Sequence, residues 1–168
     1  MAKQNKILQL AFISLFLSVS VKGQTYLKKN ESMVICFQTI NGKKLMLAVD
    51  TVNKYLVYRY GTDKHIELEY PNDRHASYDK FKYFHYTRGG GPQNDGEEIY
   101  ELHFMIDNFT YKVYDDWHAI GWLYETGIVI ENNKTHKKTI IKGKIKTKQG
   151  GLNYLYENDI LPFSDEAF

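Results

Sequence analysis

The sequence predicts an all-β fold: a single antiparallel β-sandwich or barrel of about eight or nine short strands, following an N-terminal signal peptide. Two observations carry this prediction. Short runs of alternating polar and apolar residues recur between clusters of turn-forming residues. No segment offers the sustained apolar spacing of a helix of ordinary length.

The N-terminal residues 1–23 have the pattern of a secretory signal peptide. A basic start precedes the apolar run 7–21, and small residues precede a predicted cleavage before Gln24. The run is interrupted by polar residues, whereas a membrane span needs about 20 predominantly apolar ones. We therefore expect an exported protein, periplasmic or secreted and not embedded in a membrane, with one β domain over residues 24–168.

The charge balance argues against nucleic acid as a partner. The chain has 22 Lys and Arg against 20 Asp and Glu, and three of the lysines lie in the predicted signal peptide. The mature chain is then nearly neutral, without the basic stripe that nucleic-acid binding needs. The lysine-rich segment 134–148 is the exception, and its alternation with Thr139, Ile140 and Ile141 favours a solvated hairpin over a site for a polyanion.

The one cysteine, Cys36, has no partner for an intramolecular disulfide. It lies in the apolar run 33–37, so we expect a buried thiol that packs as a small hydrophobic group. No cofactor or metal is expected.

The strands are predicted in chain order as follows. The first four cover residues 33–39, 44–50, 55–60 and 65–70, with a turn at Asn41-Gly42 and a stop at Pro71. A central meander covers 80–88, 98–106 and 109–115. A last hairpin covers 126–131 and 137–142. Residues 118–124 fit a loop or a strand start, and residues 152–162 fit a short helix or an edge strand.

The meander is the centre of the prediction, and its pairing defines two faces. A loop over residues 89–97 would set Arg88 opposite Glu98, and the Asp107-Asn108 turn would set Phe104 beside Tyr111. One face, expected in the core, would carry Phe84, Tyr86, Tyr100, Leu102, Phe104, Ile106, Phe109, Tyr111 and Val113. The other, expected to reach water, would carry Phe81, Tyr83, His85, Glu101, His103, Lys112 and Tyr114.

Three stretches carry a resemblance to known proteins. Residues 58–61 (Tyr-Arg-Tyr-Gly), 66–71 (Ile-Glu-Leu-Glu-Tyr-Pro) and 86–91 (Tyr-Thr-Arg-Gly-Gly-Gly) resemble a group of small exported bacterial proteins of unassigned function. A fainter likeness is to the periplasmic C-type lysozyme inhibitors, through Cys36 on the first strand and the turn at Gly42. Both resemblances imply an envelope location, and the second implies inhibition of an enzyme.

The first candidate site is the loop formed by Arg88, Gly89, Gly90 and Gly91. Glycines let the backbone approach a partner closely, and one guanidinium could enter an acidic cleft such as that of a glycosidase. The alternative, which we favour, is an ordinary hairpin connection in which Arg88 pairs with Glu98.

The second candidate site is the polar face of the meander and the segment after it. Its residues are Tyr83, His85, Glu101, His103, Tyr114, Trp117 and Trp122. The imidazoles and the carboxylate could converge on a metal, although solvated cross-strand pairs are the favoured interpretation. The aromatic rings could form a platform for sugars, although strands and cores also use such residues.

No Gly-x-Ser-x-Gly or His-Glu-x-x-His motif occurs, so we do not expect an enzyme. The sequence favours a non-enzymatic binding protein whose partner is an extracytoplasmic protein, with inhibition of an envelope-damaging enzyme as the sharpest form. Carbohydrate binding through exposed Trp and Tyr residues is the alternative.

Overall fold

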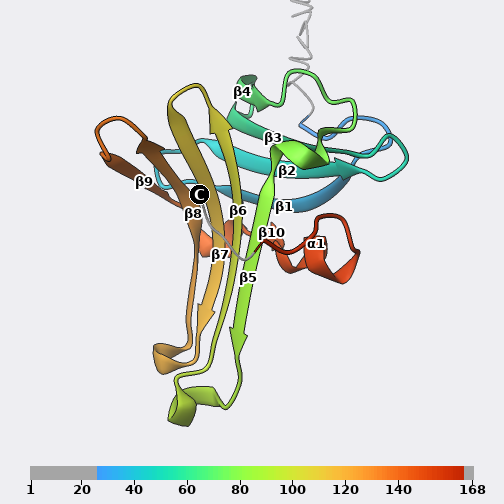
Figure 1. The fold of residues 1–168 in the computed structure, drawn as a ribbon. Coiled ribbons are helices and arrows are strands. Elements are labelled where there is room, and N and C mark those ends of the chain that lie inside the picture. The colour runs from blue at the N-terminus through green and yellow to red at the C-terminus, as the bar shows by residue number, and fades with distance from the viewer. Residues whose placement is uncertain (1–25, 165–168) are drawn as a thin grey trace, which may run out of the picture.

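Ten strands form two five-stranded antiparallel sheets that pack against each other, which confirms the predicted all-β class (Figure 1). The computed structural model describes residues 26–164, and the predicted signal peptide lies outside them. The first sheet has the order β10-β1-β2-β3-β4, with β1 Ser32–Gln38, β2 Lys44–Asp50, β3 Tyr55–Thr62, β4 His65–Tyr70 and β10 Gln149–Gly150. The second has the order β5-β6-β7-β8-β9, with β5 Lys82–Arg88, β6 Glu97–Ile106, β7 Phe109–His118, β8 Leu123–Asn132 and β9 Lys138–Lys142.

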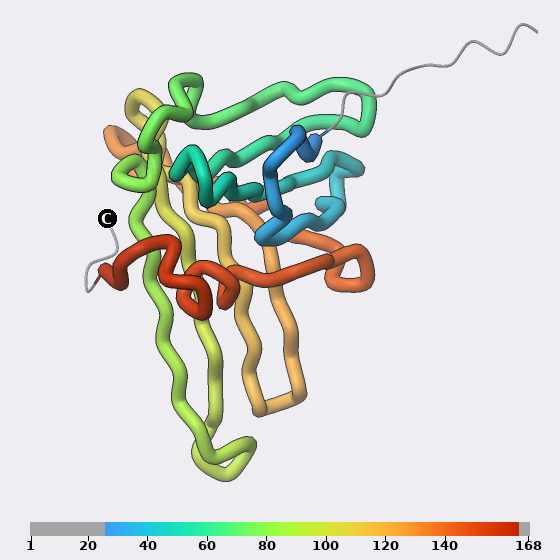
Figure 2. Tube along the Cα trace, turned by 90° about the vertical axis from the view of Figure 1, so that its right-hand side faces the viewer, coloured from blue at the N-terminus to red at the C-terminus, as the bar shows by residue number. Residues whose placement is uncertain are grey.

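The two sheets differ in direction and in reach. Their strands cross steeply, and the first sheet covers only one half of the longer strands β5 to β8 (Figure 1). The other half projects away from the sandwich as two long hairpins, which the tube view shows from the side (Figure 2). One half of the second sheet therefore contributes to the core between the sheets, and the other half extends beyond the first sheet.

The core between the sheets is built around Phe104. Its ring stacks on Tyr111 at 5.1 Å and on Tyr70 at 4.7 Å between centroids, and Tyr58 lies 4.9 Å away. Apolar side chains from both sheets belong to the same core cluster: Phe37, Leu45, Leu47, Leu56, Leu102, Val113 and Ile128. Tyr70 and Tyr111 therefore pack against the core although each is only half-buried.

The C-terminal part of the chain joins the two sheets. After β9 the chain crosses to β1, where Gly143 bridges to Thr39, and then forms β10. The short helix α1 Asn153–Glu157 follows, so the helical alternative for this region is the right one. The Tyr83 hydroxyl donates to the Leu152 carbonyl at 3.1 Å, and Ser164 N donates to the Tyr83 carbonyl at 2.9 Å. The end of the described chain thus lies against the outer edge of β5.

The second hairpin of the meander pairs as predicted, but the first is shifted by one residue. Phe104 pairs with Tyr111, as expected from the two-residue turn. Arg88 pairs with Glu97 instead of Glu98, and Leu102 pairs with Tyr83 instead of Phe84. A one-residue shift moves every side chain of β5 to the opposite face.

This shift corrects the predicted faces. Phe81 and Tyr83, expected in water, are only 5% and 1% exposed and belong to the core. Phe84 and Tyr86 lie on the outer face, where Tyr86 is exposed. Phe109 was also expected in the core and is exposed, because it lies at the end of its strand beside the Asp107-Asn108 turn.

The outer face of the first sheet is covered by the segment that precedes β1. Tyr26, Cys36 and Met46 form a small buried cluster there, so the expectation of a buried, unpaired thiol is confirmed. Beside this cluster the fully buried Arg59 forms ion pairs with Glu31 and Glu69, both at 2.6 Å. The segment is thus fixed to the sheet by both apolar and ionic contacts.

Among residues 26–164, no helix is long and apolar enough to cross a membrane.

Candidate functional site

The free end of the long hairpins brings together the Arg88–Gly91 loop and the turn after β7. A 3-10 turn over Gly91–Asn94 lies beside a second one over Ile120–Trp122. Ala119 N donates to the Gly96 carbonyl at 2.7 Å and ties the two loops to each other. We call this region, residues 88–97 and 118–124, the projecting end. Residues 118–124, for which loop and strand were both open, supply the end of β7, the turn and the start of β8.

Arg88 is held by its own loop. Its Nε donates to the Asp95 carbonyl at 2.7 Å, and its Nη2 lies 2.8 Å from Asp95 Oδ2 and 3.1 Å from Glu97 Oε1. Gly90 and Gly91 have φ of 103° and 60°, which lets the chain turn back so that Asp95 reaches the guanidinium. The prediction that Arg88 pairs with Glu98 was wrong by one residue, because its partner is Glu97. The guanidinium braces the loop, and its charge is balanced there.

Three aromatic side chains lie close together where β7 and β8 enter the projecting end. Trp117 lies 6.0 Å from Trp122 and 6.4 Å from Tyr124 between ring centroids. Trp122 is 68% exposed and Tyr124 is 53% exposed, whereas Trp117 is half-buried beneath them. Trp117 and Tyr124 are cross-strand neighbours on the face that carries the core further along the sheet. We call these three residues the aromatic corner.

The backbone at Trp122 is unusual for so large a residue. Its φ is 50°, in the left-handed region that bulky side chains rarely adopt. The preceding Gly121 has φ of 75°, so two consecutive residues make this tight turn. Such a conformation costs about 1–3 kcal/mol and persists where the surroundings determine it. Here it holds an indole ring in solvent at the tip of the hairpin.

A small hollow of ≈140 Å³ adjoins the aromatic corner. Its walls are Trp117 and Tyr124 together with polar residues of β6, β7 and the C-terminal segment: Glu98, Tyr100, Asp115, Asp116, Lys148 and Asn153. Lys148 Nζ pairs with Asp115 Oδ1 at 2.5 Å, and Leu152 N donates to Asp115 Oδ2 at 3.2 Å. These contacts fix the C-terminal segment as one wall of the hollow.

Two buried polar atoms of β7 have no hydrogen-bond partner within the described part of the chain. They are the indole Nε1 of Trp117 and Oδ1 of Asp116. Burial is the main cause that raises the pKa of Asp116 to about 6, and the nearby Glu101 carboxylate raises it further. Because neighbouring strand residues point to opposite faces, Asp116 lies on the outer face with Glu101 and Lys112, and only Trp117 Nε1 lies on the face of the hollow. Buried polar groups are normally paired, so this indole N–H is an unused donor there.

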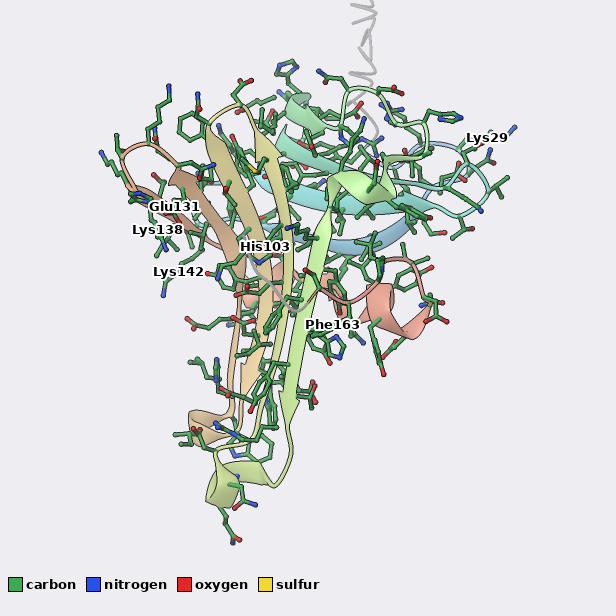
Figure 3. All side chains as sticks on the ribbon, viewed as in Figure 1. Lys29, His103, Glu131, Lys138, Lys142 and Phe163 are labelled. Carbon is green, nitrogen blue, oxygen red and sulfur yellow. The ribbon has the colours of Figure 1, made fainter. Side chains whose placement is uncertain are left out.

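The outer face of the second sheet carries a polar network that the sequence analysis had partly predicted. Glu101 lies 2.8 Å from His103 Nε2 and 2.6 Å from Lys112 Nζ. Burial opposes ionisation of Glu101, but the bonds from His103 and Lys112 outweigh it and lower its pKa. Thr110, Val129, Glu131, Lys138 and Ile140 complete a pocket of ≈330 Å³ over these residues. Figure 3 shows that His103, Glu131 and Lys138 face the same side.

The predicted trio of His85, Glu101 and His103 does not assemble. Because of the register shift, His85 points to the inner face, where its ring lies 4.5 Å from Tyr156 and 5.2 Å from Phe163. Among the residues that the structure describes, no group of three or more His, Cys, Asp or Glu residues is placed to hold a metal ion.

The remaining predicted residues fall into separate places. Tyr83 is buried, and Tyr114 lies on the outer face, where its ring covers Gly127, so neither joins the aromatic corner. Of the predicted residues, Trp117 and Trp122 meet in the aromatic corner, and Glu101 and His103 meet on the outer face. The sequence did not indicate Glu98, Lys148 or Asn153 as site residues. The single available signal was the density of aromatic residues over 117–124.

The fold and this end of the molecule define an all-β sandwich protein with a projecting, aromatic-tipped sheet. No protein-family model, no curated protein and no solved structure matches the chain.

Proposed function

We propose that the chain is an exported, non-enzymatic binding protein that holds a saccharide at the aromatic corner. The observation that supports this best is the cluster of Trp117, Trp122 and Tyr124 at the edge of a polar hollow. Two exposed rings over a half-buried third are a costly arrangement in water, because each exposed ring leaves apolar surface unburied.

The rings and the hollow suit the two kinds of surface that a sugar presents. Aromatic faces pack against the apolar C–H faces of a pyranose ring. Around them, Glu98 offers acceptors, Lys148 and Asn153 offer donors, and Trp117 Nε1 is an unused donor. This mixture of apolar walls and a few convergent polar groups is typical of small-molecule sites.

A quantitative binding measurement on a glycan array, followed by calorimetry, tests this proposal. We expect Trp122→Ala to raise the Kd of a bound glycan by about tenfold or more, equivalent to ~1.4 kcal/mol, the scale of one ring contact. Tyr86→Ala is the matched control, because Tyr86 is also an exposed aromatic residue of the second sheet but lies on its outer face. Equal losses in the two variants, or no glycan bound by the parent protein, would reject the proposal.

A second candidate function, inhibition of an envelope-damaging enzyme, is supported by the shape of the same end. The projecting end reaches beyond the sandwich (Figure 1), and Ile120, Trp122 and Leu123 are exposed at its turn. A braced, apolar tip can enter the cleft of an enzyme with little loss of entropy on binding. Because Arg88 is already paired with Asp95 and Glu97, the apolar turn is a better candidate than the guanidinium for the contact with the enzyme.

Cell-wall hydrolase assays distinguish the two candidates. An inhibitor slows a purified glycosidase at stoichiometric concentration, and Ile120→Asp then relieves the inhibition. A saccharide-binding protein leaves the rate unchanged when soluble substrate is in excess. Inhibition that survives both Ile120→Asp and Trp122→Ala would place the contact elsewhere.

A further inference from the structure

The positive charge of this chain is concentrated in one segment. Of the 22 Lys and Arg residues, seven lysines lie within residues 134–148, and the other 15 stand against all 20 Asp and Glu. The lysines are Lys134, Lys137, Lys138, Lys142, Lys144, Lys146 and Lys148. We call them the lysine edge. A local excess of one sign on an otherwise acidic molecule attracts partners of the opposite sign.

The lysine edge follows one side of the molecule across both sheets. It begins in the turn before β9, which is the outermost strand of the second sheet, and Figure 3 shows Lys138 and Lys142 on this side. The chain then crosses to the first sheet, where Ile40 N donates to the Lys142 carbonyl at 2.9 Å and Lys144 N donates to the Gln38 carbonyl at 2.7 Å. The backbone beneath the lysines is therefore fixed.

Only some of these lysines have acidic partners. Lys138 pairs with Glu131 at 3.2 Å, Lys142 with Glu125 at 3.6 Å, and Lys148 with Asp115 at 2.5 Å. The other four are exposed and form no ion pair with the described residues: Lys134, Lys137, Lys144 and Lys146. They are available to an external anion.

Protection of a sheet edge explains only part of this pattern. Lysines on an exposed edge strand discourage pairing with another chain, which accounts for Lys138 and Lys142 within β9. Lys134 lies in the turn before β9, and Lys144 and Lys146 lie after β9 ends. Those three lysines lie outside the edge strand, so protection of its unpaired backbone groups does not account for them.

We propose that the lysine edge binds a linear acidic polysaccharide. A row of ammonium groups along a narrow edge matches successive carboxylate or phosphate groups of an extended polymer better than it matches a flat membrane surface. The row ends at Lys148, which is also a wall of the hollow beside the aromatic corner. The inference thus deepens the proposed function, since it gives the saccharide a negative charge and a second, extended contact.

Polygalacturonate and its methyl ester provide a matched pair of ligands, because they share a sugar backbone and esterification removes the carboxylate charges. We expect the protein to bind polygalacturonate, with a Kd that rises steeply as salt is added, and not to bind the ester. The triple variant Lys134→Gln/Lys144→Gln/Lys146→Gln should raise the Kd about tenfold, the sum expected from three exposed ion contacts.

The control triple variant removes the same charge elsewhere: Lys29→Gln/Lys54→Gln/Lys64→Gln. These lysines are exposed, and Lys29 lies on the side of the molecule away from Lys138 and Lys142 (Figure 3). This variant should bind polygalacturonate like the parent protein. Equal weakening by both triple variants, or equal binding of the ester, would overturn the inference. Tighter binding to phosphatidylglycerol vesicles than to polygalacturonate would also overturn it, in favour of a membrane.

Trp122→Ala separates this inference from the proposed function. If Trp122→Ala binds polygalacturonate normally while the lysine triple variant does not, binding by the lysine edge is supported and saccharide binding at the aromatic corner is rejected. If the lysine triple variant binds normally while Trp122→Ala does not, saccharide binding at the aromatic corner is supported and binding by the lysine edge is rejected.

Discussion

Arg59 is the largest side chain that is fully buried, and its surroundings explain how the fold tolerates it. Its guanidinium donates to both carboxylate oxygens of Glu31 at 2.6 and 2.7 Å, to Glu69 at 2.6 Å and to the Tyr26 carbonyl at 2.6 Å. The bidentate geometry and the extra bonds offset the cost of removing the charges from water. This network fixes the segment before β1 to the first sheet.

Arg59→Met should therefore destabilise the protein strongly. The change leaves Glu31 buried without its main counter-charge, which typically costs about 3–5 kcal/mol. The free energy of unfolding in urea measures this loss. Arg88→Met is the control, because the Arg88 ion pairs are exposed and should contribute less than about 1 kcal/mol. A similar loss in both variants would contradict our account of the buried network.

Asp116 should make the protein less stable as the pH rises from about 4 to about 6. Burial and the neighbouring Glu101 raise its folded pKa from 3.8 to about 6, against the opposing effects of Lys112 and His118. The folded state therefore binds more protons than the unfolded state in this range, so stability falls as Asp116 ionises. Asp116→Asn should remove this slope and stabilise the protein at pH 7, by on the order of 1 kcal/mol after solvent screening.

Urea unfolding of Asp116→Asn and the parent protein at pH 4 and pH 7 measures this effect. Glu69 acts in the opposite direction: the bonds from Arg59 and Arg74 outweigh burial and lower its pKa from 4.5 to about 2. Its contribution is present above pH 4.5 and is lost as the pH falls towards 2. Because the parent protein and Asp116→Asn both contain Glu69, the comparison of the two proteins at each pH isolates the Asp116 effect. If the free energy of unfolding changes between pH 4 and pH 7 by the same amount in Asp116→Asn and in the parent protein, the proposed effect of Asp116 is excluded.

At the scale of elements, the irregular pairing of β3 with β4 depends on Gly61. The register shifts between Tyr60 and Gly61, and an added Cβ at Gly61 would lie 2.2 Å from the His65 carbonyl oxygen and 2.7 Å from Glu67 N. Both obstacles are backbone atoms of the next strand, so they cannot rotate away. The two strands can approach this closely only at a residue without a side chain.

Gly61→Ala should cost about 2–3 kcal/mol of the free energy of unfolding, in the range for overpacking. Gly89→Ala is the matched control: an added Cβ there has no heavy atom within 4 Å, and its φ is not in the left-handed region. That variant should stay within about 0.5 kcal/mol of the parent protein. Thermal unfolding of the two variants measures both effects, and equal stabilities would refute the steric argument.

The meander shows what sequence patterns can and cannot specify. A two-residue turn leaves one way to pair β6 with β7, so that register could be predicted. The glycine-rich connection of β5 and β6 allows several lengths. In addition, β5 and the residue before it carry aromatic side chains on both faces: Phe81 and Tyr83 on one, Phe84 and Tyr86 on the other. Alternation therefore could not distinguish the correct register from its neighbour, and the error moved Tyr83 and His85 out of the predicted site.

At the scale of the whole molecule, the two halves of the second sheet should differ in local stability. The sandwiched half contains fully buried residues such as Leu102, Phe104 and Val113. The projecting half is held chiefly by its own strand pairing, together with the C-terminal segment on one face. Local opening is easiest where few apolar contacts are lost.

Amide hydrogen exchange should resolve this difference. Amides at Glu98, Tyr100 and Trp117 should exchange at least about tenfold faster than those at Leu102 and Val113, although all belong to paired strands. A glycan bound at the aromatic corner should slow exchange at Trp117 selectively. Uniform protection along β6 and β7 would show that the projecting half is as stable as the core.

The site could be predicted less well than the fold, because it depends on distant segments. The strands follow from local alternation, which the sequence displays directly. The hollow combines β6 and β7 with Lys148 and Asn153, which reach it only because the chain crosses between the sheets at Gly143. No local pattern around Lys148 indicates that crossing, and the same holds for the pairing of Arg59 with Glu31.

The contact between Ser164 and β5 bears on self-association. Phe163 bridges to Tyr83 in parallel, and its ring lies 6.1 Å from Phe84, so the chain itself occupies part of the margin of the second sheet. Deleting residues from Phe163 onward would free main-chain groups beside aromatic side chains, which is the arrangement from which chains stack into fibrils. Truncated preparations should consequently be prone to oligomerise, and purification tags are better placed away from this end.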